Sequence, residues 1–264
     1  IVNPKPTIKL LNLKKDIKTV KYNWVSKGLG IAAGDSIILV AEPFCGKTHF
    51  ASYLAVCIST GTPIFGKFAI DRKGDVAHLN YDSSDDLTEV GYIRMINGLK
   101  DKIDENDVKV YYEKPIWKFN HDVAYENLTK ACTGKVVCII DSLRTCYEGV
   151  EDGSETSVYI ALANRVSNET GCAIIFLAHP GKGGIGNKGI DAVRGSSAMV
   201  AAAGTLWTLE KTPEDQVIKF NSTHKSRYGS RQIFYYRYDN TGEYCENINT
   251  TESIHMTIPE DEAP

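Results

Sequence analysis

The chain has 264 residues, enough for one large α/β domain or two small ones. Its composition, 42% hydrophobic and 24% charged, is ordinary for a soluble globular protein with a substantial core. A formal net charge of -3 argues against a protein that coats DNA with its outer surface, so any nucleic-acid contact should be confined to a few basic residues.

Short apolar runs and longer segments with helical spacing alternate along the chain. The runs predict strands at 36–40, 75–81, 108–112, 135–141 and 172–179. The segments between them predict helices at 48–60, 85–99, 121–132 and 157–170. From Thr205 to Tyr238, β-favouring runs separated by Gly, Asn and Pro predict antiparallel strands or hairpins. This order predicts an α/β fold, a mostly parallel twisted sheet flanked by helices, with antiparallel strands at its C-terminal end.

We expect three parts: an N-terminal arm or linker at 1–30, one α/β domain at 31–240 and a partly disordered tail at 241–264. The chain starts with Ile1 rather than Met, so a further domain could precede it in a longer parent protein. Seven scattered cysteines, two of them inside expected strands, favour reduced thiols in the cytosol. No apolar stretch approaches the length that spans a bilayer, so no membrane partner is expected.

The segment AEPFCGKT, from Ala41 to Thr48, fits the P-loop pattern with alanine in place of the first glycine. It lies between an expected buried strand and a helix, where backbone N–H groups and the helix N-terminus can surround phosphate oxygens. Lys47 would neutralise the β/γ charge and the Thr48 hydroxyl would reach Mg²⁺. The expected nucleotide-binding residues are Glu42, Pro43, Phe44, Cys45, Gly46, Lys47, Thr48 and His49.

Asp141 ends the apolar run VVCIID, at the carboxyl end of an expected parallel strand. Ligands of α/β proteins bind at such strand ends. By itself the residue fits a strand-ending carboxylate that caps the next turn equally well. Beside a P-loop, we interpret it as a partner of the Mg²⁺ ion.

From about Trp24 to Glu210, and more loosely to Tyr238, the order of motifs resembles the RecA-like ATPases of hexameric helicases, especially plasmid RepA-type and DnaB-type motors. After the P-loop come GTPIFGKF, DVAHLNYD, VVCIIDSLR, CAIIFLAHPGKG and RGSSAMV, in the order of that family. The resemblance implies a RecA-like P-loop fold, ATP and Mg²⁺ as ligands, and a ring, most often a hexamer, on single-stranded DNA.

The resemblance assigns the activation of the attacking water to Asp82, where the family has a glutamate. Aspartate is one methylene shorter, so the base would reach further or act through a second water, which puts the hydrolysis rate in question. Asp85, Asp86 or Glu89 could substitute, although they also suit the N-terminus of the expected helix.

His179 falls where these motors place a polar sensor of the γ-phosphate, although a histidine satisfied by backbone groups would fit there too. The glycine-rich segment after it corresponds to the loop that faces the central channel. Lys182, Lys188 and Arg194 are its candidates for contacts with DNA phosphates, and a solvated surface loop explains the same composition.

The segment HKSRYG, from His224 to Gly229, resembles the part of a ring subunit that reaches the γ-phosphate bound by its neighbour. Lys225 and Arg227 would then stabilise transition-state charge in trans. A basic hairpin tip on a solvated edge strand is the alternative.

The sequence therefore predicts an ATP-hydrolysing motor of a ring-shaped DNA helicase, acting in phage, plasmid or mobile-element replication. A longer parent chain would add a primase or polymerase domain. Two alternatives stay open: a RecA/RadA-like recombination ATPase that forms filaments, and a nucleotide-dependent loader or regulator with slow hydrolysis. A closed ring of subunits would indicate the helicase, and an open helix would indicate the recombination ATPase. The N-terminal arm could pack on a neighbouring subunit in either assembly.

Overall fold

The computed structural model describes residues 22–82, 84–148, 153–180, 197–214, 217–229 and 231–237. Its strands are β1 (Trp24–Ser26), β2 (Ile31–Ala32), β3 (Ser36–Ala41), β4 (Val76–Asn80), β5 (Val110–Glu113), β6 (Val137–Asp141), β7 (Ala173–Ala178), β8 (Thr205–Lys211), β9 (Val217–Ser226) and β10 (Ile233–Arg237). Its helices are α2 (Lys47–Thr60), α3 (Asp85–Leu99), the short 3-10 helix η1 (Glu105–Asp107), α4 (Ala124–Cys132), α5 (Gly153–Thr170) and α6 (Ser197–Ala202).

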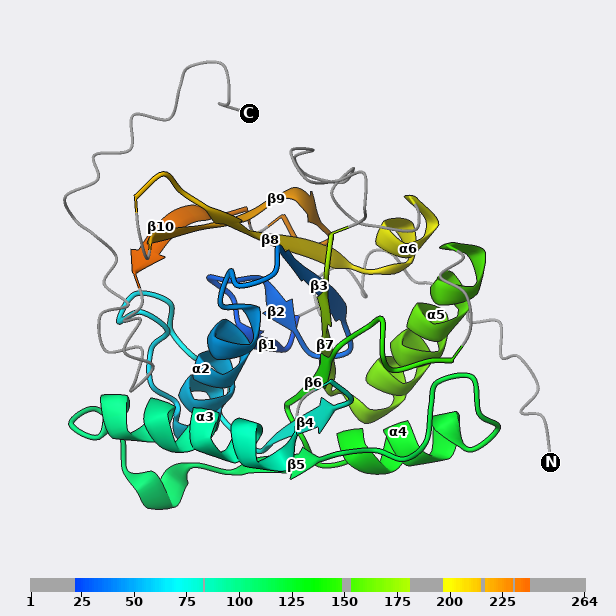
Figure 1. The fold of residues 1–264 in the computed structure, drawn as a ribbon, viewed down its shortest axis with the longest axis horizontal. Coiled ribbons are helices and arrows are strands. Elements are labelled where there is room, and N and C mark those ends of the chain that lie inside the picture. Colours follow the sequence, from blue (N-terminus) through cyan, green and yellow to red (C-terminus); the bar gives the residue numbers. More distant parts are fainter. Residues whose placement is uncertain are drawn as a thin grey trace, which may run out of the picture.

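Eight strands form one sheet in the order β10-β9-β8-β3-β7-β6-β4-β5. Neighbours from β8 to β5 pair in parallel, and β9 and β10 add antiparallel pairs at one edge (Figure 1). This arrangement confirms the predicted mostly parallel sheet with antiparallel C-terminal strands. Because β3 has parallel neighbours on both sides, the loop after it lies in the middle of the carboxyl-end edge of the sheet.

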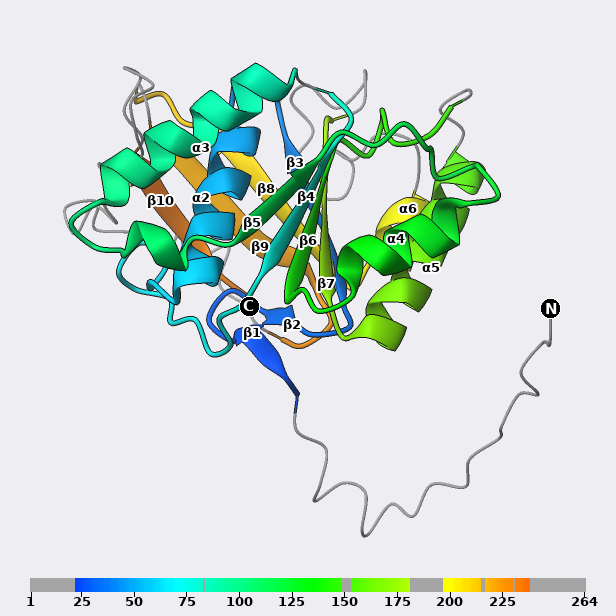
Figure 2. The ribbon, with the colours of Figure 1, turned by 90° about the horizontal axis from the view of Figure 1, so that it is seen from below.

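Helices cover both faces of the sheet, with α2 and α3 on one side and α4, α5 and α6 on the other (Figure 2). Each face has its own apolar core, and alternate residues of the central strands point into one core or the other. In β3, for example, Ile37 and Leu39 belong to the α2 side, while Ile38 and Val40 belong to the α4–α5 side. Burial on both faces explains why these strands read as continuous apolar runs.

The region before Gly34 departs from the expected N-terminal arm. Trp24–Ser26 pairs with Ile31–Ala32 as an antiparallel hairpin, which joins residues on both sides of the expected boundary at residue 30. Val25 and Leu29 are buried in the main core. Burial of these apolar side chains stabilises the hairpin against the domain, so the prediction of an arm was wrong for residues 24–30. Residues 1–21 and the expected tail at 241–264 lie outside the described residues.

The antiparallel strands are integral to the core rather than an appendage. Phe220 on β9 and Phe234 on β10 stack with ring centroids 4.5 Å apart. Both strands also reach α2, because Tyr236 on β10 stacks on Phe50 at 5.7 Å and Phe220 packs against the same ring at 5.8 Å. Aromatic packing of this kind fixes α2, and therefore the loop at its N-terminus, against strands distant in sequence. Among the described residues, no helix combines the length and apolar character that crossing a bilayer requires.

His78, in the middle of β4, is fully buried and titrates abnormally. Its Nδ1 lies 2.8 Å from the hydroxyl of Tyr92 on α3, and its Nε2 has no hydrogen-bond partner among the described residues. Burial lowers the pKa of its imidazole from 6.5 to about 4. The folded state therefore holds this histidine neutral at pH values where the unfolded chain protonates it.

We expect His78 to make stability depend on pH between 6.5 and 4. Its contribution is complete above pH 6.5 and is lost as pH falls toward 4, about 3 kcal/mol in all. The measurement is the free energy of unfolding of the wild type minus that of His78→Gln, at several pH values. The difference should fall with acidification. A flat His78 difference would contradict the expectation.

Candidate nucleotide site

The loop between β3 and α2 is shaped to receive an anion. Gly46 adopts a left-handed conformation, with φ of 70°, just before the helix begins at Lys47. Among the described residues, no side chain caps this helix N-terminus and no acidic residue lies in its first turn. The N–H groups of the first turn are thus directed at the loop, where a phosphate would complement the helix dipole.

The other expected loop residues differ in exposure. Cys45 is buried, and Glu42 is half-buried. Pro43 and His49 are exposed, and Phe44 is 91% exposed with a left-handed φ of 63°. A positive φ strains a residue that has a Cβ, so the loop holds Phe44 outward against its own preference.

Thr48 and Asp141 meet at the carboxyl ends of β3 and β6. The Thr48 hydroxyl donates to Asp141 Oδ2 at 2.9 Å. Asp141 is 1% exposed, and burial raises the pKa of its carboxyl group, opposed by the Lys47 ammonium and by the hydrogen bond from Thr48. A hydroxyl and a carboxylate oxygen this close form part of the oxygen shell that Mg²⁺ prefers when phosphates and waters supply the rest.

Lys47 and His179 form a second polar pair. Lys47 Nζ lies 3.0 Å from His179 Nε2, because β7 is the direct neighbour of β3 and both strands end at the same edge. An ammonium can only donate, so His179 accepts at Nε2 and carries its proton on Nδ1. Partial burial and the neighbouring ammonium both lower the pKa of His179. We therefore expect a neutral imidazole here.

Asp82 lies beside these groups. Its charge raises the pKa of Lys47, of Asp141 and of His179, which places it within electrostatic reach of all three. The backbone N–H of Asp82 donates to Asn80 Oδ1 at 2.9 Å. Asn80 in turn donates from Nδ2 to Thr88 Oγ1 at 2.7 Å. Sequence reasoning missed Asn80, although a polar side chain at the carboxyl end of an expected strand was the available signal.

The burial of Lys47 disfavours its charged form. Lys47 is 7% exposed, and burial lowers its pKa, while Asp141 and Asp82 act in the opposite direction. The Lys47 ammonium and the uncapped N-terminus of α2 together complement an anion with several oxygens. Among the described residues, no group of three or more His, Cys, Asp or Glu side chains could hold a metal alone. A divalent ion would accordingly need phosphate oxygens in addition to Thr48 and Asp141.

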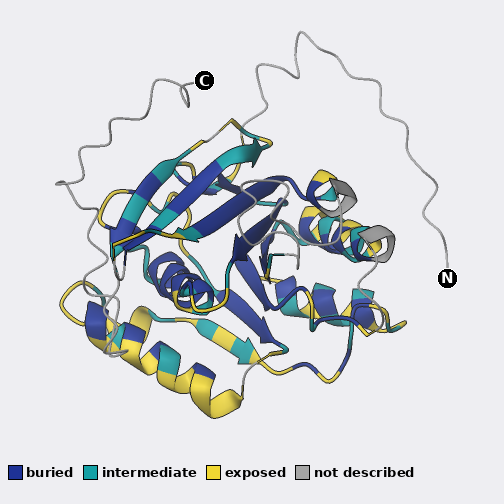
Figure 3. Ribbon diagram, turned by 45° about the horizontal axis from the view of Figure 1, so that its top comes forward, coloured by how far each residue is buried: buried dark blue, intermediate teal, exposed yellow. Residues whose placement is uncertain are grey.

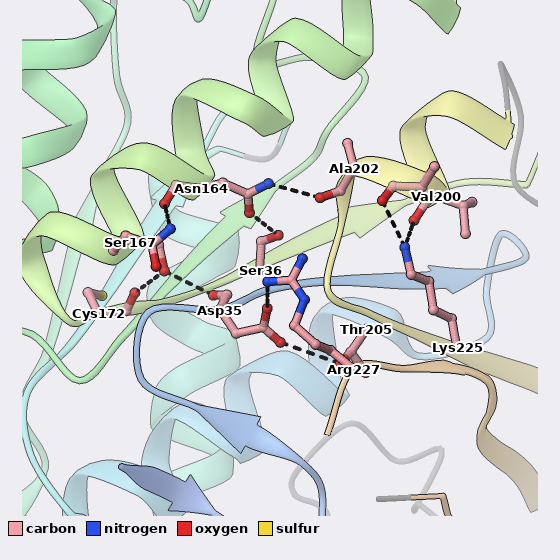
Figure 4. Close-up of polar contacts among 12 residues, drawn as sticks. Asp35, Ser36, Asn164, Ser167, Cys172, Val200, Ala202, Thr205, Lys225 and Arg227 are labelled. Carbon is pink, nitrogen blue, oxygen red and sulfur yellow. Dashed lines mark hydrogen bonds and ion pairs between the residues drawn. The ribbon is translucent and has the colours of Figure 1, made fainter. Parts of the chain in front are cut away.

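Lys225 and Arg227 lie at the amino ends of the parallel strands, opposite the carboxyl ends that carry the P-loop (Figure 4). Lys225 Nζ donates to the carbonyls of Val200 at 2.5 Å and Ala201 at 2.9 Å, near the C-terminus of α6. Arg227 Nη1 pairs with Asp35 Oδ1 at 3.1 Å. Asp35 immediately precedes β3, so both cations lie at the amino ends of the parallel strands, away from their own P-loop.

Asp35 is a buried carboxylate, paired with Arg227, that the sequence analysis did not identify. It is fully buried, and burial raises the pKa of its carboxyl group while Arg227 opposes the rise. Thr205 Oγ1 lies 3.5 Å from its other oxygen. A Cβ on Gly204 would come within 1.9 Å of Asp35 Oδ1, which explains the glycine.

The structure thus brings Lys47, Asp141 and His179 together at the carboxyl ends of the strands. It places the two cations of the C-terminal strands at the opposite ends. Within one subunit, Lys225 and Arg227 do not reach the site that Lys47 and Asp141 form. A role at the γ-phosphate would therefore have to be played at a neighbouring subunit. Lys182, Lys188 and Arg194 lie outside the described residues.

Comparison with solved structures supports the same fold. A DnaB-like replicative helicase, described with its interactions with primase, matches with a TM-score of 0.63 and 12% identity over 80% of this chain and 57% of that one. This chain thus spans a little over half of that helicase. A structure solved as an isolated ATPase domain matches with a TM-score of 0.62 and 13% identity over 90% of this chain and 96% of that one. The RadB recombinase matches with a TM-score of 0.58 and 12% identity over 84% of this chain and 93% of that one.

These matches show a RecA-like P-loop fold, as the order of motifs predicted. The sequence profile of the AAA domain family matches residues 12–184, which include the P-loop, Asp82, Asp141 and His179. The chain belongs to that family. No curated protein matches its sequence.

Proposed function

We propose that this ATPase domain is the motor of a ring-shaped DNA helicase that translocates on single-stranded DNA during phage, plasmid or mobile-element replication. The observation that carries the ATPase part is the meeting of Lys47, Thr48, Asp141 and His179 at one edge of the sheet. The likeness to a DnaB-like replicative helicase supports the helicase part. A helicase of this kind would act in the cytosol of the host cell. The six described cysteines, none of which forms a disulfide, are consistent with that reducing compartment.

Each residue of the site has a role in this proposal. Lys47 and the N–H groups of the first turn of α2 bind the β- and γ-phosphates of ATP. Thr48 and Asp141 would hold Mg²⁺, which would supply charge neutralisation on the phosphate oxygens. Asp82 orients and deprotonates the attacking water. His179, already hydrogen-bonded to Lys47 through Nε2, would give up that contact, turn its protonated Nδ1 to donate to a γ-phosphate oxygen and so report its presence.

The chemistry of Asp82 can be tested by changing its length and charge. Asp82→Asn should leave ATP binding unchanged and lower turnover about 100-fold or more, because general-base catalysis contributes roughly 10²–10⁴-fold. Asp82→Glu, which extends the carboxylate by one methylene, should keep or raise the rate. The measurement is phosphate release at saturating ATP, with binding followed by a fluorescent ATP analogue. Equal rates for the wild type and Asp82→Asn would assign the base to another residue.

The proposal includes partners beyond the chain. Copies of the domain form a homo-oligomeric ring, a hexamer by analogy with helicases of this type, in which Arg227 and Lys225 complete the site of the adjacent subunit. Lys182, Lys188 and Arg194 contact phosphates of single-stranded DNA in the channel. A primase is a further partner in this proposal, supported by the likeness to a DnaB-like helicase described with its interactions with primase.

The test is the steady-state ATPase rate with Mg²⁺, with and without single-stranded DNA, over a range of protein concentrations. A rate per subunit that rises with concentration and again with DNA is expected of an assembling motor with shared sites. A forked duplex in the same buffer should be unwound in an ATP-dependent manner. Failure to unwind, with DNA-stimulated ATPase intact, would reject the helicase function and keep the ATPase.

A second candidate is a recombination ATPase, favoured by the likeness to RadB. Closed rings in electron micrographs of the protein with ATP and DNA would support the helicase, and open helical filaments would support the recombinase. The aspartate at position 82 favours a third candidate, a loader or regulator with slow hydrolysis. A slow rate that ignores both DNA and protein concentration would support that role.

A further inference from the structure

Asn80 is a buried amide at the carboxyl end of β4, next to the candidate nucleotide site. It pairs in register with Asp141 on β6. The following residue, Tyr81, donates from its backbone N–H to the Asp141 carbonyl at 2.6 Å, so the chain is tied to β6 up to the residue before Asp82. Ile139, two residues before Asp141, belongs to the core on the α2 side. By strand alternation, Asn80 and Asp141 therefore point to the face that α2 and α3 cover.

The hydrogen bonds of Asn80 have a fixed direction. The backbone N–H of Asp82 can only donate, so the atom that accepts from it at 2.9 Å is the amide oxygen Oδ1. The amide nitrogen of Asn80 then faces Thr88 and donates to Oγ1 at 2.7 Å. The Thr88 hydroxyl donates its own hydrogen to the Ser84 carbonyl at 3.2 Å. Three hydrogen bonds thus connect the turn that carries Asp82, through Asn80, to the first turn of α3.

This network is shielded from water. The helix α3 is exposed along its outer side and buried where it faces the sheet (Figure 3). Thr88 lies on the buried side and is 7% exposed, and Asn80 is fully buried. Buried hydrogen bonds of this kind stay formed, because breaking one leaves a polar group without a partner at a cost in free energy. The turn between β4 and α3 is therefore held in one geometry.

The restraint matters because Asp82 itself is exposed. Its carboxylate is one methylene from the backbone, so a fixed backbone leaves the carboxylate only a few rotamers. Asp82 lies within electrostatic reach of Lys47, Asp141 and His179, so these rotamers lie beside the candidate site. A short side chain has little freedom to correct a displaced backbone. The position of the Asp82 carboxylate thus depends on the hydrogen bond that Asn80 accepts.

The acidic residue that begins α3 is placed differently. Asp85 accepts from the Tyr112 hydroxyl at 2.8 Å, on the edge strand β5. That strand lies on the far side of β4 from β6, which carries Asp141. Asp85 is therefore engaged at the edge of the sheet, while Asn80 holds Asp82 beside β6. This separation favours Asp82 over Asp85 as the group that acts on the attacking water.

We propose that Asn80, with Thr88 behind it, is a positioning residue for Asp82 in ATP hydrolysis. Asn80 fixes the backbone of Asp82, and Thr88 keeps the Asn80 amide in the orientation that accepts from it. The proposal rests on the proposed function in one respect, the role of Asp82 as the base. In this arrangement the turn, rather than the length of the side chain, sets the reach of the carboxylate.

The first experiment removes the Thr88 hydroxyl from the full chain and keeps the shape of the side chain. Thr88→Val should lower kcat for ATP with Mg²⁺ about tenfold or more, because a misplacement of about 1 Å can cost roughly 100-fold. Binding of a fluorescent ATP analogue should stay unchanged, because Thr88 does not touch the nucleotide in this proposal. Thr88→Ser, which retains the hydroxyl, should retain most of the rate.

Thr129→Val is the matched control for this change. Thr129 also donates its hydroxyl hydrogen to the carbonyl four residues before it, but on α4, which covers the other face of the sheet (Figure 2). It should leave kcat unchanged. Thermal unfolding is recorded for every variant, and kcat is compared at a temperature where all are folded. Wild-type kcat for Thr88→Val, or an equal loss for Thr88→Ser and Thr88→Val, would overturn the proposal.

A second experiment asks whether Thr88 and Asn80 act through Asp82. Adding Thr88→Val or Asn80→Ala to Asp82→Asn should cause no further loss of kcat, because the group that they position is already absent. Residues that act independently would instead multiply their separate losses. Full multiplication would overturn the proposal. A slow Asp82→Asn beside wild-type kcat for Thr88→Val and Asn80→Ala would reject the positioning role alone, whereas wild-type turnover of Asp82→Asn would reject the base as well.

Discussion

Replacing Lys47 by alanine is expected to lower ATP turnover by about 10³-fold or more, the largest effect of any single change in this chain. Lys47 is the one cation buried among the described candidates at the P-loop edge. Burial lowers its pKa, and Asp141 and Asp82 lie close enough to oppose that shift. Without Lys47, the β- and γ-phosphates would face two carboxylates with no protein cation between them. Binding should weaken as well, because the ammonium contacts the ground state and the transition state alike.

The measurement is phosphate release at several ATP concentrations, beside binding of a fluorescent ATP analogue. Lys67→Ala is the matched control, because Lys67 is exposed and lies over the Phe68 ring rather than in the site. It should leave both quantities unchanged. Thermal unfolding should be recorded for each variant, since removing Lys47 also takes a compensating charge from buried Asp141. Turnover of Lys47→Ala within a few-fold of wild type, in a folded protein, would refute the P-loop assignment.

Much of the site was accessible from the sequence because parallel strands align their carboxyl ends. Ala41–Thr48, Asp141 and His179 each lie at the end of a continuous apolar run, so their meeting at one edge follows from the fold class. The structure adds the specific contacts, such as Thr48 with Asp141, which depend on strand order rather than on sequence spacing. Strand order is a property of the whole chain, so no local pattern reveals it.

The parts that the sequence did not predict are short elements and distant pairs. The β1–β2 hairpin has strands of three and two residues, too few for a periodic pattern. The partner of Arg227 is 192 residues away, and their contact requires β8 to lie between β3 and β9. The local motif HKSRYG predicted that Arg227 acts in trans or lies at a basic hairpin tip, and it indicated no partner for Arg227 within its own chain. Its partner Asp35, between Gly34 and Ser36, resembles an ordinary turn residue in the sequence.

Arg227→Ala is expected to have two separable consequences. The first is a loss of about 2 kcal/mol in the free energy of unfolding, because Asp35 would stay buried without its cation. The value lies below the roughly 3–5 kcal/mol of a fully buried pair, since the Arg227 side chain is 48% exposed. The second is loss of hydrolysis with binding retained, if Arg227 stabilises transition-state charge at the adjacent subunit.

Asp35→Asn distinguishes the two, because it removes the ion pair and leaves the guanidinium in place. We expect Asp35→Asn to hydrolyse ATP at temperatures where it is folded, and Arg227→Ala not to. Mixing Arg227→Ala with Lys47→Ala subunits should restore part of the rate, since some interfaces then pair an intact Lys47 with an intact Arg227. Equal hydrolysis by both single variants, or no restoration on mixing, would limit Arg227 to its structural pairing with Asp35.

A role in trans also places a demand on the assembly itself. The guanidinium cannot serve both partners with the same donor at once, so assembly would have to loosen the contact between Arg227 and Asp35. Asp35→Asn should then stabilise the assembled protein, because it removes a buried carboxylate left without its cation, whereas it should destabilise the dilute monomer, in which the ion pair is intact. Equal sensitivity in both states would mean that the ion pair persists in the assembly, and that Arg227 stays at its own Asp35 when subunits meet.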